Sequence, residues 1–138
     1  VPKTLEVLET NGVPVVTYGS QEFPAFWSRA SGLKSPLTLN SPAAIANFQT
    51  TREQFGLEGG MLIANPVPEE DEIGRDEMEI YIERALSAAE EDNITGKAVT
   101  PYLLAKIFEI TEGRSLDTNI SLVRNNARLA AEIAVALV

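Results

Sequence analysis

The sequence predicts an α/β fold in which short buried strands alternate with helices. Two short runs are rich in apolar residues, and each lies between segments whose apolar residues have helical spacing. The first run contains Val15 and Val16 side by side, which is typical of a strand buried on both faces of a parallel sheet. Strands that alternate with helices build layered α/β folds. We therefore expect helices that cover a parallel sheet.

Turn and capping residues divide the first half of the chain. The segment PKTLEVLETNG predicts a short helix, because two leucines share one face and Asn-Gly is a stop signal. The next segment, VPVVTYG, predicts a strand at 13–19. A second helix is expected to begin after Ser41, a capping residue, with Pro42 at its first position and Gly56 at its end.

The second half is predicted to hold one strand and three helices. The expected elements are a buried strand at Met61–Ala64 and helices at 74–93, 100–113 and 115–138. Asp76 and Glu79 have the spacing of a capping-box variant, Thr100 is expected to cap the next helix, and Ser115 or Asp117 the last. The resulting order is α, β, α, β, α, α, α. Two or three strands cannot form a self-sufficient sheet that is covered by five helices. Further strands are therefore expected from sequence outside the chain or from another copy.

The composition argues against several function classes. Twenty acidic residues against 11 basic ones give a formal charge of −9, which disfavours nucleic acid and anionic membranes as partners. No apolar run approaches the roughly 20 residues that a membrane span needs. The lack of cysteine excludes disulfides and fits a reducing, cytoplasmic location. Because histidine is also absent, any catalysis would use carboxylates, lysine or hydroxyls.

Both ends of the chain look internal to a longer protein. The first residues, VPKTLEVLET, contain neither an initiator methionine nor a signal-peptide pattern. The last residues, IAVALV, stop within an apolar helical stretch. We therefore expect the 138 residues, which contain no long linker, to be one part of a larger polypeptide.

Three patterns have both a structural and a functional interpretation. The acidic run Glu69–Glu72 offers oxygen ligands to a metal, but it lacks the spacing of a calcium loop, so a solvated loop is favoured. The cluster of Phe23, Phe26 and Trp27 is interpreted as core or subunit contact rather than a ligand-stacking site. Asn65 follows a strand, where open α/β sheets bind ligands, and the alternative of a plain turn residue stays open.

The last predicted helix contains three asparagines, at positions 119, 125 and 126, although asparagine is a poor helix former. Asn119 and Asn126 share one helical stripe with the apolar residues Leu122, Leu129, Ile133 and Ala136. Burying an amide without a partner costs about 1–3 kcal/mol, so each needs a hydrogen bond. The pattern favours a bond to the backbone of a neighbouring loop and leaves a ligand as the alternative.

Four segments carry a resemblance to a known family. They are, in order, TLEVLETNGVPVVTYG, EFPAFWSRASG, GGMLIANPVPEE and GKAVTPYLLAKIFEITEGRSLDTNISLVRNNARLAAEIA. Together they resemble the C-terminal half of the pseudouridine-5'-phosphate glycosidases, also called the indigoidine synthase A-like family. The resemblance covers essentially the whole chain and is weakest from Ser41 to Gly56. It implies a three-layer α/β/α sandwich, with residues 1–138 as the C-terminal half of a single domain that usually forms a homotrimer.

The resemblance also implies an activity and a site. The family reversibly cleaves the C–C glycosidic bond of pseudouridine 5'-phosphate, a small molecule, to uracil and ribose 5-phosphate, through a lysine Schiff base and with a divalent metal, typically manganese. The lysine, the acid glutamate and the metal ligand belong to the N-terminal half, so this chain is expected to hold no metal and to be inactive alone. A non-catalytic binding or structural fragment of the same fold is the alternative.

One position carries over from the family motif around SLDTNISLVRNNA. The resemblance implies that Asn119 is an active-site residue that orients the substrate by hydrogen bonding. Asn126 is expected to support it from behind, and Asn65, in the motif ANPVP, is a weaker candidate for substrate binding.

Overall fold

A computed structural model describes residues 2–138 as a mixture of helices and parallel strands. The elements are α1 (Pro2–Thr10), β1 (Val15–Tyr18), β2 (Leu37–Leu39), α2 (Pro42–Gln54), β3 (Leu62–Ala64), the 3-10 turn η1 (Glu69–Asp71), α3 (Arg75–Glu91), the 3-10 turn η2 (Gly96–Ala98), α4 (Val99–Ile110) and α5 (Arg114–Ala136). The α/β fold class predicted from the sequence is confirmed.

The three strands form one parallel sheet in the order β2-β1-β3. Val16 of the central strand aligns with Leu37 on one side and Ile63 on the other. Val16 is completely buried and Val15 almost so, as the adjacent valines predicted. The prediction that β3 is fully buried is wrong. Its residues are half-buried because β3 pairs with β1 on one side only within the part of the chain that the structure describes.

The strand β2 was not predicted. It has three residues, Leu37–Leu39, and such a short run cannot show an alternating pattern. Its pairing depends on contacts that are remote in sequence, since it aligns with β1 and the Thr38 hydroxyl donates to the carbonyl of Ser20 over 2.8 Å. The tertiary fold, rather than local propensity, makes this segment a strand.

The ends of α2 agree with the sequence-based expectation. The Ser41 hydroxyl accepts a hydrogen bond from the backbone N–H of Ala44 over 3.1 Å, and Pro42 is the first helical residue. Gly56 has a φ of 67°, so it can reverse the chain directly after the helix.

Three predicted helix caps are wrong. The residue before α3 is Gly74, and no side chain caps that helix, so Asp76 and Glu79 do not form a capping box. Thr100 lies inside α4, because the turn η2 already begins the helical path before it. The start of α5 needs neither Ser115 nor Asp117, as described below.

The helix α5 begins directly after the left-handed Gly113, which has no capping side chain, and one N–H of its first turn is bonded by the residue that follows α4. The Thr111 hydroxyl, near the end of α4, accepts a hydrogen bond from the N–H of Ser115 over 3.1 Å. An N-terminal N–H of α5 is therefore satisfied from outside the helix, and Ser115 itself is a donor of this bond instead of a cap.

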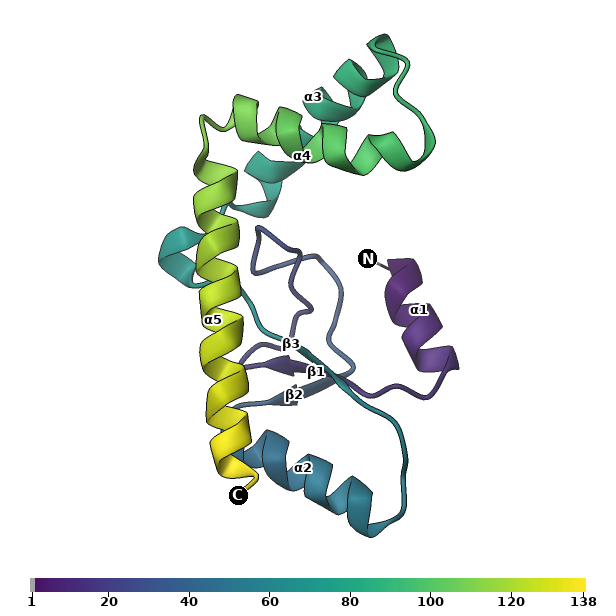
Figure 1. The fold of residues 1–138 in the computed structure, drawn as a ribbon, viewed down its shortest axis with the longest axis vertical. Helices are drawn as coiled ribbons and strands as arrows, with labels where there is room; N and C mark the ends of the chain where they lie inside the picture. Colours follow the sequence, from purple (N-terminus) through teal and green to yellow (C-terminus); the bar gives the residue numbers. More distant parts are fainter. Residues whose placement is uncertain (1) are drawn as a thin grey trace.

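Helix α5 runs along one side of the molecule past the ends of the strands, with the α3–α4 pair at one end and α2 at the other (Figure 1). The α3–α4 pair closes a core around Ile73, Met78, Ala85 and Ile107, while α2 packs against α5. The first helix, α1, lies apart and buries no residue completely; its two leucines, which the sequence placed on one face, are half-buried. In the described residues no helix has both the length and the apolar character required to cross a bilayer.

Candidate functional site

The carboxyl ends of β1 and β3 meet beneath α5 and border a cavity of about 520 Å³. Its lining residues are Tyr18, Gly19, Arg29, Asn65, Pro66, Pro68, Glu70, Asn125, Arg128, Leu129 and Glu132. Asn65 lies at this edge of the open parallel sheet, where α/β proteins commonly bind ligands. Carboxamides, guanidinium groups and carboxylates all face the cavity, so it suits a polar ligand.

Two of the three asparagines of α5 hold the loop that leaves β3. Asn65 donates a side-chain hydrogen bond of 3.2 Å to the Oδ1 atom of Asn126. Asn125 donates to the carbonyl of Pro66 over 3.0 Å, and its own Oδ1 accepts from Arg128 over 2.6 Å. The bond to a loop backbone that the sequence favoured for Asn119 and Asn126 is thus made by Asn125, for which it was not predicted. Asn126 bonds a loop side chain instead of the backbone.

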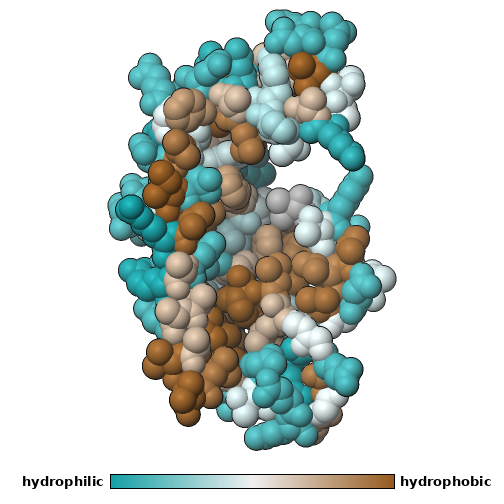
Figure 2. All heavy atoms as spheres, viewed as in Figure 1, coloured by the Kyte–Doolittle hydropathy of each residue, from teal (hydrophilic) through white to brown (hydrophobic). Residues whose placement is uncertain are grey.

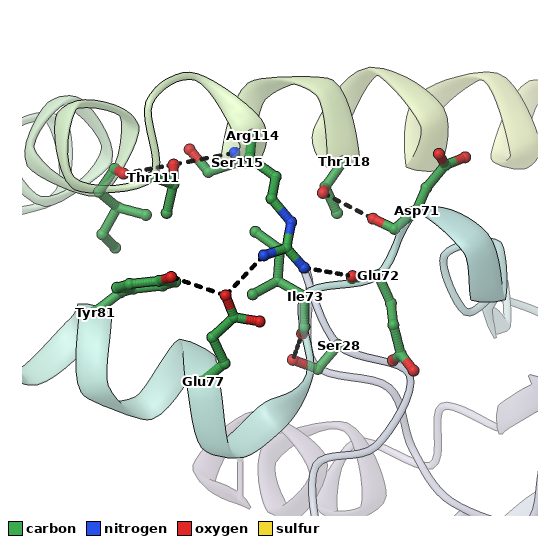
Figure 3. Close-up of polar contacts among 11 residues, drawn as sticks. Ser28, Asp71, Glu72, Ile73, Glu77, Tyr81, Thr111, Arg114, Ser115 and Thr118 are labelled. Carbon is green, nitrogen blue, oxygen red and sulfur yellow. Dashed lines mark hydrogen bonds and ion pairs between the residues drawn. The ribbon is translucent and has the colours of Figure 1, made fainter.

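The hydrogen bonds between α5 and the loop after β3 continue toward the N-terminus of the helix. The Asp71 side chain accepts from Ser121 over 2.5 Å, and its carbonyl accepts from Thr118 over 2.8 Å. Arg114 then donates to the carbonyl of Glu72 over 3.3 Å (Figure 3). We call this set of α5 residues (Arg114, Thr118, Ser121 and Asn125) the polar seam. Their spacing of four, three and four places them on one helical face, so α5 and the loop are held in a single register.

The polar seam ends in a corner where α3, α4 and α5 meet. Glu77 of α3 accepts a hydrogen bond of 2.8 Å from the Tyr81 hydroxyl and a bond of 2.7 Å from Arg114 (Figure 3). These two donors, Tyr81 first and Arg114 second, lower the pKa of Glu77 below its usual value. The bond to the carboxylate of Glu77 also raises the pKa of Tyr81. This corner fixes the direction in which α5 leaves α4.

A second loop, between β1 and β2, donates hydrogen bonds to the start of α5 and to the loop after η1. The indole N–H of Trp27 donates to the carbonyl of Ser115 over 3.1 Å, and the Ser28 hydroxyl donates to the carbonyl of Ile73 over 2.6 Å. Trp27 packs against the core, which agrees with its prediction as a core residue. Phe26 stands edge-on to Trp27 at 4.6 Å but is 50% exposed, so it is not a core side chain.

Arg29 is a site residue that the sequence analysis missed. Its Nη1 atom donates to the carbonyl of Val67 over 2.6 Å, and its backbone N–H donates to the carboxylate of Glu72 over 3.0 Å. It thereby joins the two loops that border the cavity. A single arginine in an aromatic loop has no spacing or neighbour that would indicate this role, so no sequence signal identified it.

The acidic run Glu69–Glu72 is not simply a solvated loop. It forms the turn η1, and its last two residues accept the bonds from α5 and Arg29 described above. Across residues 2–138 no group of three or more acidic, histidine or cysteine side chains is placed to hold a metal ion. The described residues therefore do not fit a metal centre.

Asn119 lies away from the cavity and from the polar seam. It follows Thr118 on α5 but points to the neighbouring side of the helix, where it is half-buried. Two turns, or about 10 Å along the axis, separate it from Asn126. In the part of the chain covered by the structure its carboxamide has no hydrogen-bond partner, and it does not line the cavity. The structure brings together Asn65 and Asn126 but not Asn119.

The fold and site define an α/β protein with a polar cavity at the carboxyl edge of a parallel sheet, a place typical of ligand-binding and catalytic α/β domains. A model of the family described as "Indigoidine synthase A like protein" matches residues 1–136. The chain belongs to this family, as its motifs indicated.

Similar proteins share one name. The chain is 77% identical over 125 residues to pseudouridine-5'-phosphate glycosidase 1 of Rhizobium johnstonii. This match covers 91% of the chain and 39% of that relative. It is 64% identical over 137 residues to the pseudouridine-5'-phosphate glycosidase of Mesorhizobium japonicum. That match covers 99% of the chain and 45% of the relative. The chain thus spans less than half the length of these relatives.

Two solved structures share the fold. One is the prealnumycin C-glycosynthase AlnA in complex with ribulose 5-phosphate, with 29% sequence identity and a TM-score of 0.89. The match covers 99% of this chain and 45% of the AlnA chain. The other is an indigoidine synthase A-like protein of Thermotoga maritima, with 40% sequence identity and a TM-score of 0.81. The match covers 97% of this chain and 44% of the Thermotoga chain.

Proposed function

We propose that this chain is the C-terminal half of a domain that reversibly cleaves the C–C glycosidic bond of pseudouridine 5'-phosphate to uracil and ribose 5-phosphate. The observation that carries the proposal is the 77% and 64% identity to relatives with the name pseudouridine-5'-phosphate glycosidase. The name of the structural neighbour AlnA, a C-glycosynthase, supports the same bond type in the direction of synthesis.

The chemistry needs an amine that this chain does not provide in the expected context. In the proposed reaction a lysine upstream of Val1 attacks the anomeric carbon and opens the sugar ring. When the C–C bond then breaks, the nitrogen lone pair forms a C=N bond, and the uracil carbon takes a proton from an acid. Water hydrolyses the resulting Schiff base and releases ribose 5-phosphate. The present chain contributes binding and orientation.

Asn119 is the residue of this chain that we assign to the substrate. It lies between the buried face of α5 and a side that has no partner within the described residues, and its amide can donate and accept hydrogen bonds. We assign Asn65 and Asn126 weaker, supporting roles: Asn65, in the loop after β3, donates a hydrogen bond to Asn126, which lies two turns along α5 from Asn119. The metal, for which manganese is the candidate, is assigned to polypeptide outside residues 2–138, because the described side chains form no metal cluster.

The test is turnover of pseudouridine 5'-phosphate by the complete domain, with uracil release measured by chromatography. We expect Asn119→Ala to lower kcat roughly a hundredfold, the scale for removing one hydrogen-bonding group from a reacting centre. Its circular dichroism and melting temperature should stay unchanged, because the amide makes no hydrogen bond within residues 2–138.

Asn47→Ala is the control, since Asn47 is an exposed asparagine in the interior of α2. Unchanged turnover in Asn119→Ala would remove the assignment of this residue. A complete domain that binds the nucleotide without releasing uracil would instead support the alternative, a non-catalytic binding fragment.

A further inference from the structure

Two neighbouring residues of α5, Thr118 and Ser121, bind the same residue of the loop after β3. Thr118 is only 2% exposed, and its hydroxyl donates to the carbonyl of Asp71 over 2.8 Å (Figure 3). One turn further along the helix, Ser121 donates to the carboxylate of Asp71 over 2.5 Å. Both acceptor groups of Asp71 are therefore bound by α5, so the helix cannot rotate at this point without losing a hydrogen bond.

Asp71 is a restrained attachment point for the helix. It ends the turn η1, which follows Pro68, and its N–H donates to the carbonyl of Pro68 over 3.1 Å. Proline restricts φ, and a second proline before the turn, Pro66, is buried. Arg114 of α5 also donates to the carbonyl of the next residue, Glu72, over 3.3 Å. These bonds tie the rotation of α5 to the position of a stiff turn.

Asn119 follows Thr118 and is turned from it by about 100° around the helix axis. Figure 2 shows hydrophilic side chains on the side of α5 where Figure 1 places η1, and hydrophobic side chains along the next face of the helix. Asn119 is half-buried, and its carboxamide makes no hydrogen bond within residues 2–138. The direction of this amide therefore depends on the rotation of α5, which the bond from Thr118 restrains.

A small rotation of α5 would move the carboxamide of Asn119 by a chemically relevant distance. Side chains of a helix extend about 5–6 Å from its axis, so a rotation of about 10° moves their ends by about 1 Å. A misplacement of about 1 Å can lower the rate of a reaction about a hundredfold, because the reacting groups must meet in the correct geometry. A hydrogen bond that limits this rotation can therefore matter more for turnover than for stability.

We propose that Thr118 is a positioning residue, whose bond to Asp71 orients Asn119 toward the substrate. Thr118 acts without touching the substrate, because its side chain is buried and its hydroxyl is bonded to the loop. The inference rests on the proposed function, which assigns Asn119 to the substrate. It adds that the turn η1, to which no catalytic group is assigned, contributes to turnover through α5.

The test is a double-mutant cycle in the complete domain, with release of uracil from pseudouridine 5'-phosphate as the readout. Thr118→Val keeps the shape of the side chain but removes the hydroxyl, and it should lower kcat about tenfold. Its melting temperature should fall by only about 2–4 °C. In the Asn119→Ala background the same substitution should leave kcat nearly unchanged, because the residue that Thr118 orients is gone. Thr118→Ser retains the hydroxyl and should retain the wild-type kcat.

Thr51→Val is the matched control. Thr51 is a half-buried threonine of α2, and its hydroxyl donates to the carbonyl of Asn47 within the same helix over 2.7 Å, so this variant should keep the wild-type kcat. Ser121→Ala is a second variant at a half-buried position, which keeps the test valid if Thr118→Val does not fold. It removes the other bond to Asp71 and should lower kcat to a smaller extent, again only while Asn119 is present.

Three results would overturn the proposal. The first is a wild-type kcat in both Thr118→Val and Ser121→Ala. The second is an equal loss of kcat with and without Asn119, which would show that Thr118 acts through the fold alone. The third is wild-type turnover in Asn119→Ala, which would remove the residue through which Thr118 is proposed to act.

A complete domain that binds pseudouridine 5'-phosphate without releasing uracil would contradict the proposed function instead. The same cycle is then measured in the Kd for this nucleotide by calorimetry. Coupling between Thr118 and Asn119 in Kd would support the positioning role, and additive losses of affinity would overturn it.

Discussion

The two flanks of α5 differ in their contacts: one is hydrogen-bonded to a loop, and the other is apolar and exposed. On one flank, four polar residues of the seam bond the loop between β3 and α3, and every bond joins groups that are about 50 residues apart in the sequence. On the other flank, which we call the apolar flank, Leu116, Ile120 and Val123 are 46%, 42% and 58% exposed. The helix is therefore positioned by the first flank and available for contact on the second. This division predicts that stability and partner binding can be changed separately.

The largest contrast is expected between two isoleucines. Ile73, in the loop held by the seam, is fully buried, whereas Ile120 on the apolar flank is 42% exposed. Ile73→Ala should lower the free energy of unfolding by about 2–5 kcal/mol, because it opens a cavity in the core. Ile120→Ala should change it by no more than about 0.5 kcal/mol. Urea denaturation followed by circular dichroism measures both.

Equal losses in the two isoleucine variants would contradict this contrast, since they would show that the apolar flank is already packed. A loss for Ile120→Ala that appears only in the complete family domain would instead support it. The same substitution would then report burial on the unpartnered side.

A smaller contrast is expected between two asparagines of the same helix. Asn125→Ala removes the donor to the carbonyl of the buried Pro66 and should cost about 1 kcal/mol of unfolding free energy. Asn119→Ala removes no bond that the structure shows, and alanine is the better helix former. Its unfolding free energy should therefore stay the same or rise by a few tenths of a kcal/mol. Thermal melting of the two variants under one buffer distinguishes them.

If Asn119→Ala destabilised the chain as much as Asn125→Ala, Asn119 would be a structural residue. Its assignment to the substrate would then lose its basis. An Asn125→Ala variant as stable as the wild type would show that Arg128 or water replaces the lost bond.

Local signals in the sequence predicted the fold where a single residue type decides the geometry. Adjacent valines predicted the central strand, and Ser41-Pro42 and Gly56 predicted the ends of α2. The predictions failed where a distant group decides. The strand β2 depends on its alignment with β1, and an N–H at the start of α5 donates to Thr111, the residue after α4. Neither partner can be identified from local spacing.

The candidate site shows the same limit. The position of Asn65 after a strand indicated a polar edge of the sheet, whereas Asn126 was expected to support Asn119; the structure places Asn126 in contact with Asn65 instead. Helical spacing placed Asn119 and Asn126 on one stripe, but it could not show that the stripe borders an exposed apolar flank. Arg29 was missed because its importance lies in joining two loops, which only the folded chain brings together.

The smallest expected effect concerns the corner that ends the polar seam. Hydrogen bonds from Tyr81 and Arg114 lower the pKa of Glu77, so its ionised form is favoured more in the folded than in the unfolded chain. The stabilisation is therefore present above the ordinary pKa of 4.5 and is lost as the pH falls through the lower, folded value. Glu77→Gln should flatten the decline of melting temperature in this acidic window. Glu83→Gln, which removes a charge from an exposed position of the same helix, should retain the decline. A decline of the same slope in both variants would show that Glu77 does not hold the start of α5, and the seam would then depend on its bonds to Asp71, Glu72 and Pro66.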